Sequence, residues 1–352
     1  MKRLFTILLT LALLVSGISV LAEDAPLRIG YIAPIDEEGG RHSLCADAFA
    51  YAAAQKGVSL TALRYAPAEV SEDSEFLDPA VMALNELIEE GVDGVAVVPA
   101  SMEQAVELIE RANEAGVPIL IEGMDVSPAY PSESEEEEPA EEETAERPYV
   151  AAVGYGDGAA YAATLWLEEY ADNPLMFHCA LPTGDLAIQA GIARALGDAR
   201  YLDMADELNA ASNTPAAGSE AINLLISSFT MFYCVLADSE ELAQGCADGL
   251  RRAGDSMPIA AISGTPEALE LLKRGTIDML AATPASVEGV QCFKLLFDYL
   301  TDGALPETET GFVALPVIVA TTENLSDWID GDDCESAYAL AYPEPEEEAA
   351  AE

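Results

Sequence analysis

The sequence predicts an α/β protein built as two lobes, each around a parallel β-sheet. Short apolar runs alternate with amphipathic stretches along nearly the whole chain, and this alternation is typical of parallel strands connected by helices. Glycines follow several amphipathic stretches, as expected where helices end. The chain has 352 residues, 51% of them hydrophobic, which is enough for two domains of ordinary size.

The first residues have the three-part pattern of a secretory signal peptide. Lys2 and Arg3 precede an apolar run that ends in small residues around Ala22, and such a segment is removed on export. We therefore expect residues 1–22 to be a signal peptide and exclude them from the fold. A retained membrane anchor is the alternative, because the run over 4–21 is almost long enough to span a bilayer.

The end of this signal lacks the cysteine that lipid attachment requires. The short segment 14–17 is followed by Ile18 instead. We expect an exported protein, periplasmic or secreted, that is not lipid-anchored.

The net charge restricts the partners. With 64 acidic and 15 basic residues the formal charge is −49. Such a surface repels nucleic-acid backbones and anionic lipid headgroups, so we expect neither as a partner. Solubility is the plain interpretation of this charge.

Six cysteines are spread through the chain without a CxxC motif, and the only histidines are His42 and His178. These residue types at these spacings predict no zinc site. Cys179 and Cys234 lie in apolar runs typical of buried strands, where a thiol acts as a small hydrophobe. We expect buried thiols, although an even number of cysteines in an exported chain also permits disulfides.

The first half of the chain predicts four strands and three helices. The expected strands are 27–33, 58–65, 94–99 and 117–121, and the expected helices are 42–56, 79–90 and 102–115. Gly57, Gly91 and Gly116 directly follow the three helices. Strand, helix, glycine and strand in repetition indicate right-handed crossovers on a parallel sheet.

The alternation stops at 131–146, which contains nine glutamates and no large apolar residue. A segment that repels itself and has nothing to bury is expected to be a disordered, solvated loop, which we place at 127–148. Calcium binding is the alternative, but EF-hand spacing with its turn glycine is absent from the sequence. The acidic tail at 342–352 has the same interpretation.

From Tyr149 onward the alternation predicts a second sheet. The expected strands are 150–153, 175–180, 231–237, 259–262 and 277–281, and the expected helices are 159–170, 188–196, 219–227, 239–253 and 266–274.

Several segments occur in a specific order along the chain. They are IGYIAP, EEGVDGVAVVP and AGVPIL in the first half, then MFYCVLADSEELAQGCADGLRRAG and ALPVIVATTENL in the second. In this order they resemble the type I periplasmic solute-binding proteins, the ribose- and galactose-binding group of sugar ABC transporters. The resemblance covers 27–325. It implies two Rossmann-like lobes joined by a hinge of three chain segments.

The resemblance also implies the domain boundaries. The first lobe takes 27–126 plus about 284–310, and the second takes 149–283 plus about 311–330. The acidic loop then lies at the first crossing, beside the hinge.

Ligands of open α/β sheets bind beyond the carboxyl ends of the strands, where loops and helix N-termini offer donors. Two facing lobes place two such edges on one cleft. The candidate ligand-binding residues at these edges are Asp36, Glu37, Arg41, His42, Ser101, Glu122, Asp157, Asp185, Ser239 and Ser263. Here Arg41 and His42 suit an anionic group, and the acids suit hydroxyls or a cation.

This chain departs from the residues that the sugar-binding family places in these loops. Arg41 and His42 stand where the resemblance implies an aromatic pair. Other positions have Val98 for an amide, Gly123 for an acid, Ile188 for an arginine, Ser239 for an asparagine, Ser263 for an aspartate and Ala282 for a glutamine. Three interpretations stay open: a different ligand, a lost site, or rim residues without a binding role.

No spacing of residues indicates catalysis. Neither histidine has a recognisable nucleophile or acid partner, and no phosphate-binding glycine motif occurs. We expect a protein that is not an enzyme and has no cofactor or metal. The preferred function is that a monomer captures a small polar ligand, a sugar or sugar-like molecule, between its lobes and delivers it to an ABC permease. A ligand sensor coupled to a membrane receptor and a homologue that has lost sugar binding are the alternatives.

Overall fold

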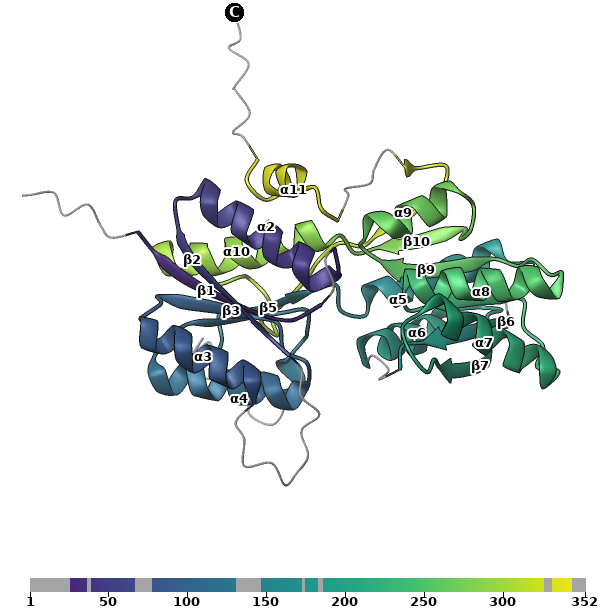
Figure 1. Ribbon diagram of the computed structural model, residues 1–352, viewed down its shortest axis with the longest axis horizontal. Helices are drawn as coiled ribbons and strands as arrows, with labels where there is room; N and C mark the ends of the chain where they lie inside the picture. Colours follow the sequence, from purple (N-terminus) through teal and green to yellow (C-terminus); the bar gives the residue numbers. More distant parts are fainter. Residues whose placement is uncertain are drawn as a thin grey trace, which may run out of the picture.

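The computed structural model describes residues 26–36, 39–66, 78–130, 147–172, 175–182, 186–325 and 331–343. These residues form two lobes side by side, each with a six-stranded sheet between layers of helices (Figure 1). The expected signal peptide and most of the acidic loop and tail, at 1–22, 131–146 and 344–352, lie outside the described residues. The predicted α/β class with two parallel sheets is confirmed.

The first sheet has the strand order β11-β5-β4-β3-β1-β2, and all its strands are parallel. They are β1 (Arg28–Pro34), β2 (Ser59–Tyr65), β3 (Gly94–Val97), β4 (Ile119–Glu122), β5 (Ala151–Gly154) and β11 (Phe312–Ala314). One face packs against α2 (Arg41–Gln55), α10 (Ala285–Asp302) and α11 (Cys334–Ala341), and the other against α3 (Pro79–Glu90) and α4 (Met102–Ala115). The central strands are apolar throughout because both faces are covered.

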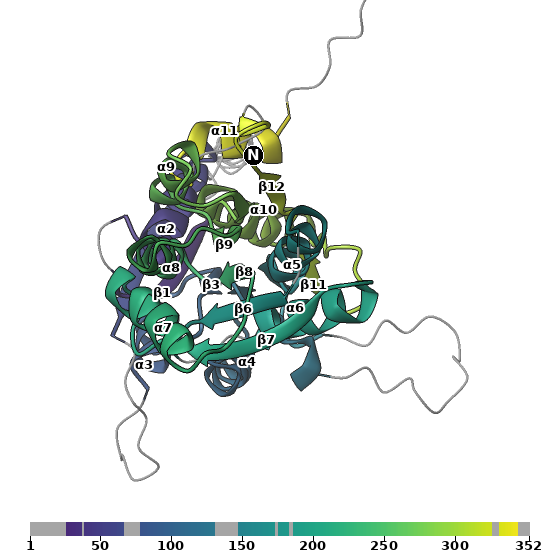
Figure 2. The ribbon, with the colours of Figure 1, turned by 90° about the vertical axis from the view of Figure 1, so that its right-hand side faces the viewer.

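The second sheet has the order β12-β10-β9-β8-β6-β7. Its strands are β6 (Leu175–Ala180), β7 (Asp203–Asn209), β8 (Cys234–Ala237), β9 (Ile259–Ser263), β10 (Met279–Ala282) and the antiparallel β12 (Ile318–Ala320). One face packs against α5 (Gly158–Tyr170) and α6 (Leu186–Asp198). The other packs against α7 (Pro215–Ser227), α8 (Glu240–Ala253) and α9 (Pro266–Lys273) (Figure 2).

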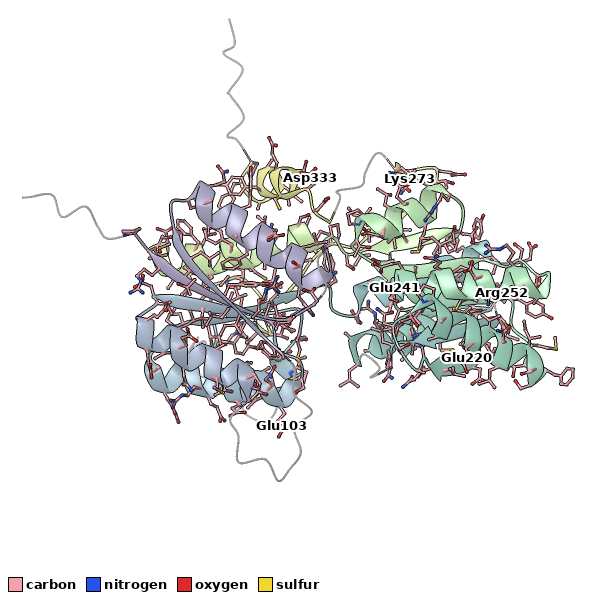
Figure 3. All side chains as sticks on the ribbon, viewed as in Figure 1. Glu103, Glu220, Glu241, Arg252, Lys273 and Asp333 are labelled. Atoms are coloured by element: carbon pink, nitrogen blue, oxygen red, sulfur yellow. The ribbon has the colours of Figure 1, made fainter. Side chains whose placement is uncertain are left out.

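Helix ends follow the signals in the sequence. Gly91 and Gly116 have φ of 73° and 70° directly after α3 and α4, in the left-handed region that glycine adopts without a steric penalty. These two predicted helix ends are confirmed. The outer faces of the helices carry charged side chains, such as Glu103 on α4, Glu220 on α7 and Lys273 on α9 (Figure 3).

Two strands pair differently from the expected division of the chain. We expected 149–154 and 311–314 in the second lobe, but β5 pairs with β4 and β11 pairs with β5 in the first sheet. The chain therefore crosses to the second lobe after Gly154 and reaches it again after Ala314. The reason is packing: Ala151 and Val153 of β5 lie in the core on one face of the first sheet and Ala152 in the core on the other, so β5 completes the first lobe instead of opening the second.

The edge strand β7 and the helix α11 were not expected from the sequence. The strand β7 has the largely polar sequence DMADELN because it lies at the edge of its sheet and none of its residues is buried. The helix α11 is short and packs on α2 and α10 in the first core.

All six cysteines are free thiols, and five of them, including Cys179 and Cys234, are buried, as expected from the sequence. Within the described ranges, no helix is long and apolar enough to cross a membrane.

Candidate functional site

The carboxyl edges of the two sheets face one another across the crossings of the chain. β5 and β11 end at Gly154 and Ala314, and the chain passes from each of them to the second lobe. β10 ends at Ala282, and the chain returns from there to α10 of the first lobe (Figure 1). The candidate site is therefore the group of loops and helix N-termini at these two edges, as the sequence predicted.

Arg41, the first residue of α2, contacts the crossing itself. Its Nη1 donates to the carbonyl oxygen of Thr283 at 2.8 Å and to Thr283 Oγ1 at 3.2 Å, while its Nη2 donates to the Glu288 carboxylate. Its guanidinium carbon lies 5.6 Å from the centroid of the Tyr155 ring. Arg41 therefore joins α2 to the segment between β10 and α10, and both of its terminal nitrogens have partners within the protein.

The charge of Arg41 is held by its neighbours. Burial opposes the charged form, but the adjacent carboxylate of Glu288, together with Cys45, Tyr155 and Glu122, outweighs burial and raises the pKa of Arg41. Arg41 thus remains a cation at all physiological pH values, and it forms an ion pair with the buried Glu288.

Glu122, at the end of β4, lies below the edge. It is only 2% exposed, and Tyr31 Oη donates to its Oε1 at 3.2 Å. Its Oε2 has no hydrogen-bond partner. Burial, together with the nearby Glu288 carboxylate, raises the pKa of Glu122 to about 7. In this conformation Glu122 is out of reach of a ligand the size of a sugar.

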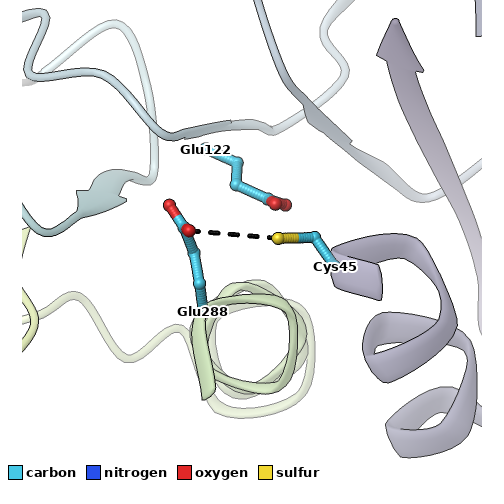
Figure 4. A group of neighbouring side chains, drawn as sticks. All are labelled: Cys45, Glu122 and Glu288. Carbon is cyan, nitrogen blue, oxygen red and sulfur yellow. Dashed lines mark hydrogen bonds between the residues drawn. The ribbon is translucent and has the colours of Figure 1, made fainter. Parts of the chain in front are cut away.

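The packing of α2 against α10 brings two further groups to Glu122. Glu288 lies on α10, and the Cys45 thiol of α2 donates to Oε2 of Glu288 at 3.9 Å (Figure 4). The helices approach so closely because residue 289 is glycine: a Cβ on Gly289 would lie 2.2 Å from the backbone oxygen of Cys45. No side chain larger than hydrogen fits there.

The three candidate serines lie at or just before helix N-termini. The Oγ of Ser101 accepts from Gln104 N, and the Oγ of Ser239 accepts from Leu242 N, each at 3.2 Å. Ser263 Oγ likewise accepts from Thr265 N at 3.2 Å. The hydroxyls of Ser101 and Ser239 thus satisfy backbone donors that a helix start leaves free, whereas the cap of α9 is Thr265 itself.

The remaining described candidates have a more open position. Asp36 accepts from Ser43 N at 3.1 Å, and Asp157 accepts from Arg194 at 3.2 Å in a partly exposed ion pair. Burial lowers the pKa of His42; Asp36 opposes this, and the cations Arg41 and Arg64 reinforce it. The remaining two candidates, Glu37 and Asp185, lie outside the described residues.

The second lobe has its own buried polar group beside this edge. His178 of β6 is 1% exposed and lies between Asp238, with Nε2 2.7 Å from Oδ1, and Glu207, with Nδ1 3.1 Å from Oε2. The other Asp238 oxygen accepts from Leu181 N at 3.0 Å. Burial opposes protonation of His178, but the hydrogen bond and charge of Asp238, then those of Glu207, outweigh it and raise its pKa.

Only part of this arrangement was expected from the sequence. Arg41 and Glu122 do come together, but around Thr283, Glu288 and Tyr155, which were not among the ten candidate residues. The signal that was overlooked is Glu288, because an acid among the uncharged residues that begin α10 is unusual in a buried segment unless a cation accompanies it.

The comparisons with known proteins agree with this architecture. A family model described as "Periplasmic binding protein domain" matches residues 43–304. No curated protein sequence matches the chain.

Solved structures align over most of their length. A periplasmic ribose ABC transporter protein from Conexibacter woesei has 14% identity and a TM-score of 0.69, covering 86% of this chain and 94% of its own. A Mycobacterium smegmatis protein in complex with β-D-fucofuranose has 18% identity and a TM-score of 0.67, covering 90% and 97%. An ABC transporter solute-binding protein from Bacillus halodurans with bound myo-inositol has 18% identity and a TM-score of 0.66, covering 87% and 98%. At these identities the likeness shows the fold, and the family model spans most of the chain. The chain therefore belongs to the periplasmic binding protein family of type I, as its ordered motifs predicted.

Proposed function

We propose that this protein is an extracytoplasmic solute-binding protein that captures a neutral, polyhydroxylated ligand between its two lobes and delivers it to an ABC permease. The observation that carries the proposal is the meeting of two carboxyl sheet edges at the crossings of the chain. Ligands of such sheets bind beyond these edges. The structural relatives support it, because they include a periplasmic ribose ABC transporter protein and proteins in complex with myo-inositol and β-D-fucofuranose.

The charges at the edges favour a neutral ligand over an anionic one. Arg41, which the sequence offered to an anion, donates to Thr283 and Glu288 instead. The partly exposed Asp157 stays available beside Arg194, and carboxylates accept strong hydrogen bonds from hydroxyls. A sugar or polyol supplies such hydroxyls, whereas a sugar acid would add a negative charge to a chain whose net charge is −49.

The protein itself performs no chemistry on the ligand in this proposal. The ligand bridges the two edges and shifts an existing equilibrium toward a closed form. The protein acts as a monomer, and the bound ligand is recovered unchanged.

A thermal-shift series tests the ligand class. The purified protein is heated with D-ribose, L-arabinose, D-allose, myo-inositol and D-gluconate, and any shift is followed by calorimetric titration. We expect at least one neutral compound to raise the melting temperature, and gluconate to leave it unchanged. A shift with gluconate alone would contradict the neutral class. No shift with any compound in a broader panel of sugars and polyols would favour a homologue that has lost this site.

A further inference from the structure

Three metal-ligating side chains converge in the interior of the first lobe. Cys45 comes from α2, Glu122 from the end of β4 and Glu288 from α10 (Figure 4). One ligand atom of each lies within 4.8 Å of the ligand atoms of the other two. All three residues are at least 98% buried, so a ligand between the lobes does not reach them. The proposed function leaves this group unexplained.

Two outer groups hold the carboxylates in place. Tyr31 Oη donates to Oε1 of Glu122, and Arg41 donates to Oε2 of Glu288. Metal ligands in proteins are held from behind in this way by hydrogen bonds that orient them. The arrangement leaves Oε2 of Glu122, in a residue that is 2% exposed, without a hydrogen-bond partner. A buried carboxylate oxygen without a partner is costly, which points to an occupant beside it.

The balance of charge indicates what kind of occupant fits. Glu122, Glu288 and a deprotonated Cys45 carry three negative charges, against the single positive charge of Arg41 in the same group. A divalent cation makes the group neutral. The combination of a thiolate with carboxylates favours a borderline ion such as Zn²⁺ over Ca²⁺ or Mg²⁺, which prefer oxygen ligands alone.

We propose that Cys45, Glu122 and Glu288 bind one divalent transition-metal ion of the Zn²⁺ class. The ion joins α2, β4 and α10, the three elements of the first lobe that meet beside the crossing. Arg41 contacts both Glu288 and Thr283, and Thr283 directly follows β10. By holding Glu288, the ion therefore also helps to hold the segment that crosses from β10 to α10. Its role is structural and is independent of which solute the lobes capture.

Cobalt titration of the metal-free protein tests the site. The protein is stripped with a chelator under reducing conditions and titrated with Co²⁺, a spectroscopic substitute for Zn²⁺. We expect one equivalent to produce a thiolate-to-cobalt charge-transfer band in the near ultraviolet, and Zn²⁺ to displace it. Zn²⁺ should also raise the melting temperature.

Variants assign the ligands. Cys45→Ala should abolish the charge-transfer band, and Glu122→Gln should lower the Co²⁺ affinity by roughly tenfold or more. Cys234→Ala is the matched control, because Cys234 is a fully buried free thiol of the other lobe, and it should keep the band and the stoichiometry.

Wild-type protein decides the question even if a variant fails to fold. If the metal-free wild type gains no charge-transfer band with Co²⁺ and its melting temperature does not move with Zn²⁺, the proposal is overturned. A band that persists in Cys45→Ala would overturn it as well. Neither outcome affects the sugar test, since that measurement uses a different part of the protein.

Discussion

The two lobes bury acids at the same edge of equivalent sheets, but they compensate the charge differently. In the first lobe, Glu288 is paired with the guanidinium of Arg41, which stays charged at any physiological pH. In the second, the buried carboxylate of Asp238 depends on the imidazole of His178, whose charge changes with pH. The comparison teaches that one edge is held by a permanent cation and the other by a titratable one. Stability should therefore respond to a mutation in one lobe and to pH in the other.

Removing Arg41, the permanent cation, should lower the unfolding free energy more than any other change considered below. In the metal-free protein, Arg41→Ala leaves the Glu288 carboxylate buried without a cation, and breaking a buried pair costs about 3–5 kcal/mol. We expect the low end, about 3 kcal/mol, because 35% of the Arg41 side chain is exposed and partly screened by solvent. Urea unfolding measures the change. Arg194→Ala breaks the exposed pair with Asp157 and should cost less than about 1 kcal/mol; equal losses in the two variants would contradict the difference.

Replacing His178, the titratable cation, should lower the unfolding free energy by about 2 kcal/mol at acidic pH, where His178 is charged and hydrogen-bonded. The pKa of His178 is raised above 6.5 in the folded protein, so the folded state holds this proton more tightly. Its stabilisation is complete below pH 6.5 and is lost as the pH rises through the folded pKa.

The unfolding free energy of the wild type and of His178→Asn, measured across this pH range, tests the assignment. We expect the pH dependence attributable to this group to disappear in the variant. If the variant keeps the full pH dependence of the wild type, the titrating group lies elsewhere.

Matched helix caps should behave alike in the two lobes, because no charge is involved. Ser101 caps α4 in the first lobe and Ser239 caps α8 in the second. Replacing either with alanine should lower the unfolding free energy by about 1 kcal/mol. The Ser239 variant should lose slightly more, since its hydroxyl also contacts Asn213 Oδ1 at 2.5 Å. A large difference between the two would mean that the lobes differ by more than their buried charges.

The smallest expected effect is a gain in stability, and it concerns Phe229 of the second lobe. Phe229 is 92% exposed and has a φ of 58°, a left-handed conformation that strains a bulky residue. Phe229→Gly should raise the unfolding free energy by about 0.5–1 kcal/mol. Phe229→Ala, which keeps a Cβ, serves as the control and should gain less. A loss of stability with glycine would show that the phenyl ring contributes contacts worth more than the strain.

Local pattern predicted those parts of the fold that local interactions decide. The helix α4 occupies 102–115 and the strand β6 occupies 175–180, as expected, because both combine clear periodicity with distinct ends. The edge strand β7 was missed because it buries none of its residues and so lacks an apolar signal. β5 was found as a strand but assigned to the wrong sheet, since its sequence does not say which neighbour it pairs with.

The candidate site was predicted less completely than the fold. The sequence predicted that Arg41 and Glu122 lie at the carboxyl edge of the first sheet, and the structure has them there, because strand ends fix where a loop emerges. It did not reveal that Glu288, more than a hundred residues after Glu122, lies beside both. The absence of a metal-binding motif in the sequence has the same cause, since Cys45, Glu122 and Glu288 come from three distant elements.

The sequence by itself determined the family, the order of most strands and helices, the ends of several helices and the buried state of the cysteines that lie in strands. Each of these depends on periodicity, on glycine at a turn or on an apolar run, which are properties of neighbouring residues. Only the tertiary structure decided that Arg41 is bound to an internal acid, that His178 lies between two carboxylates and that Glu122 keeps a carboxylate oxygen without a partner. Those features arise where distant segments pack together, and burial there changes what a charged side chain can do.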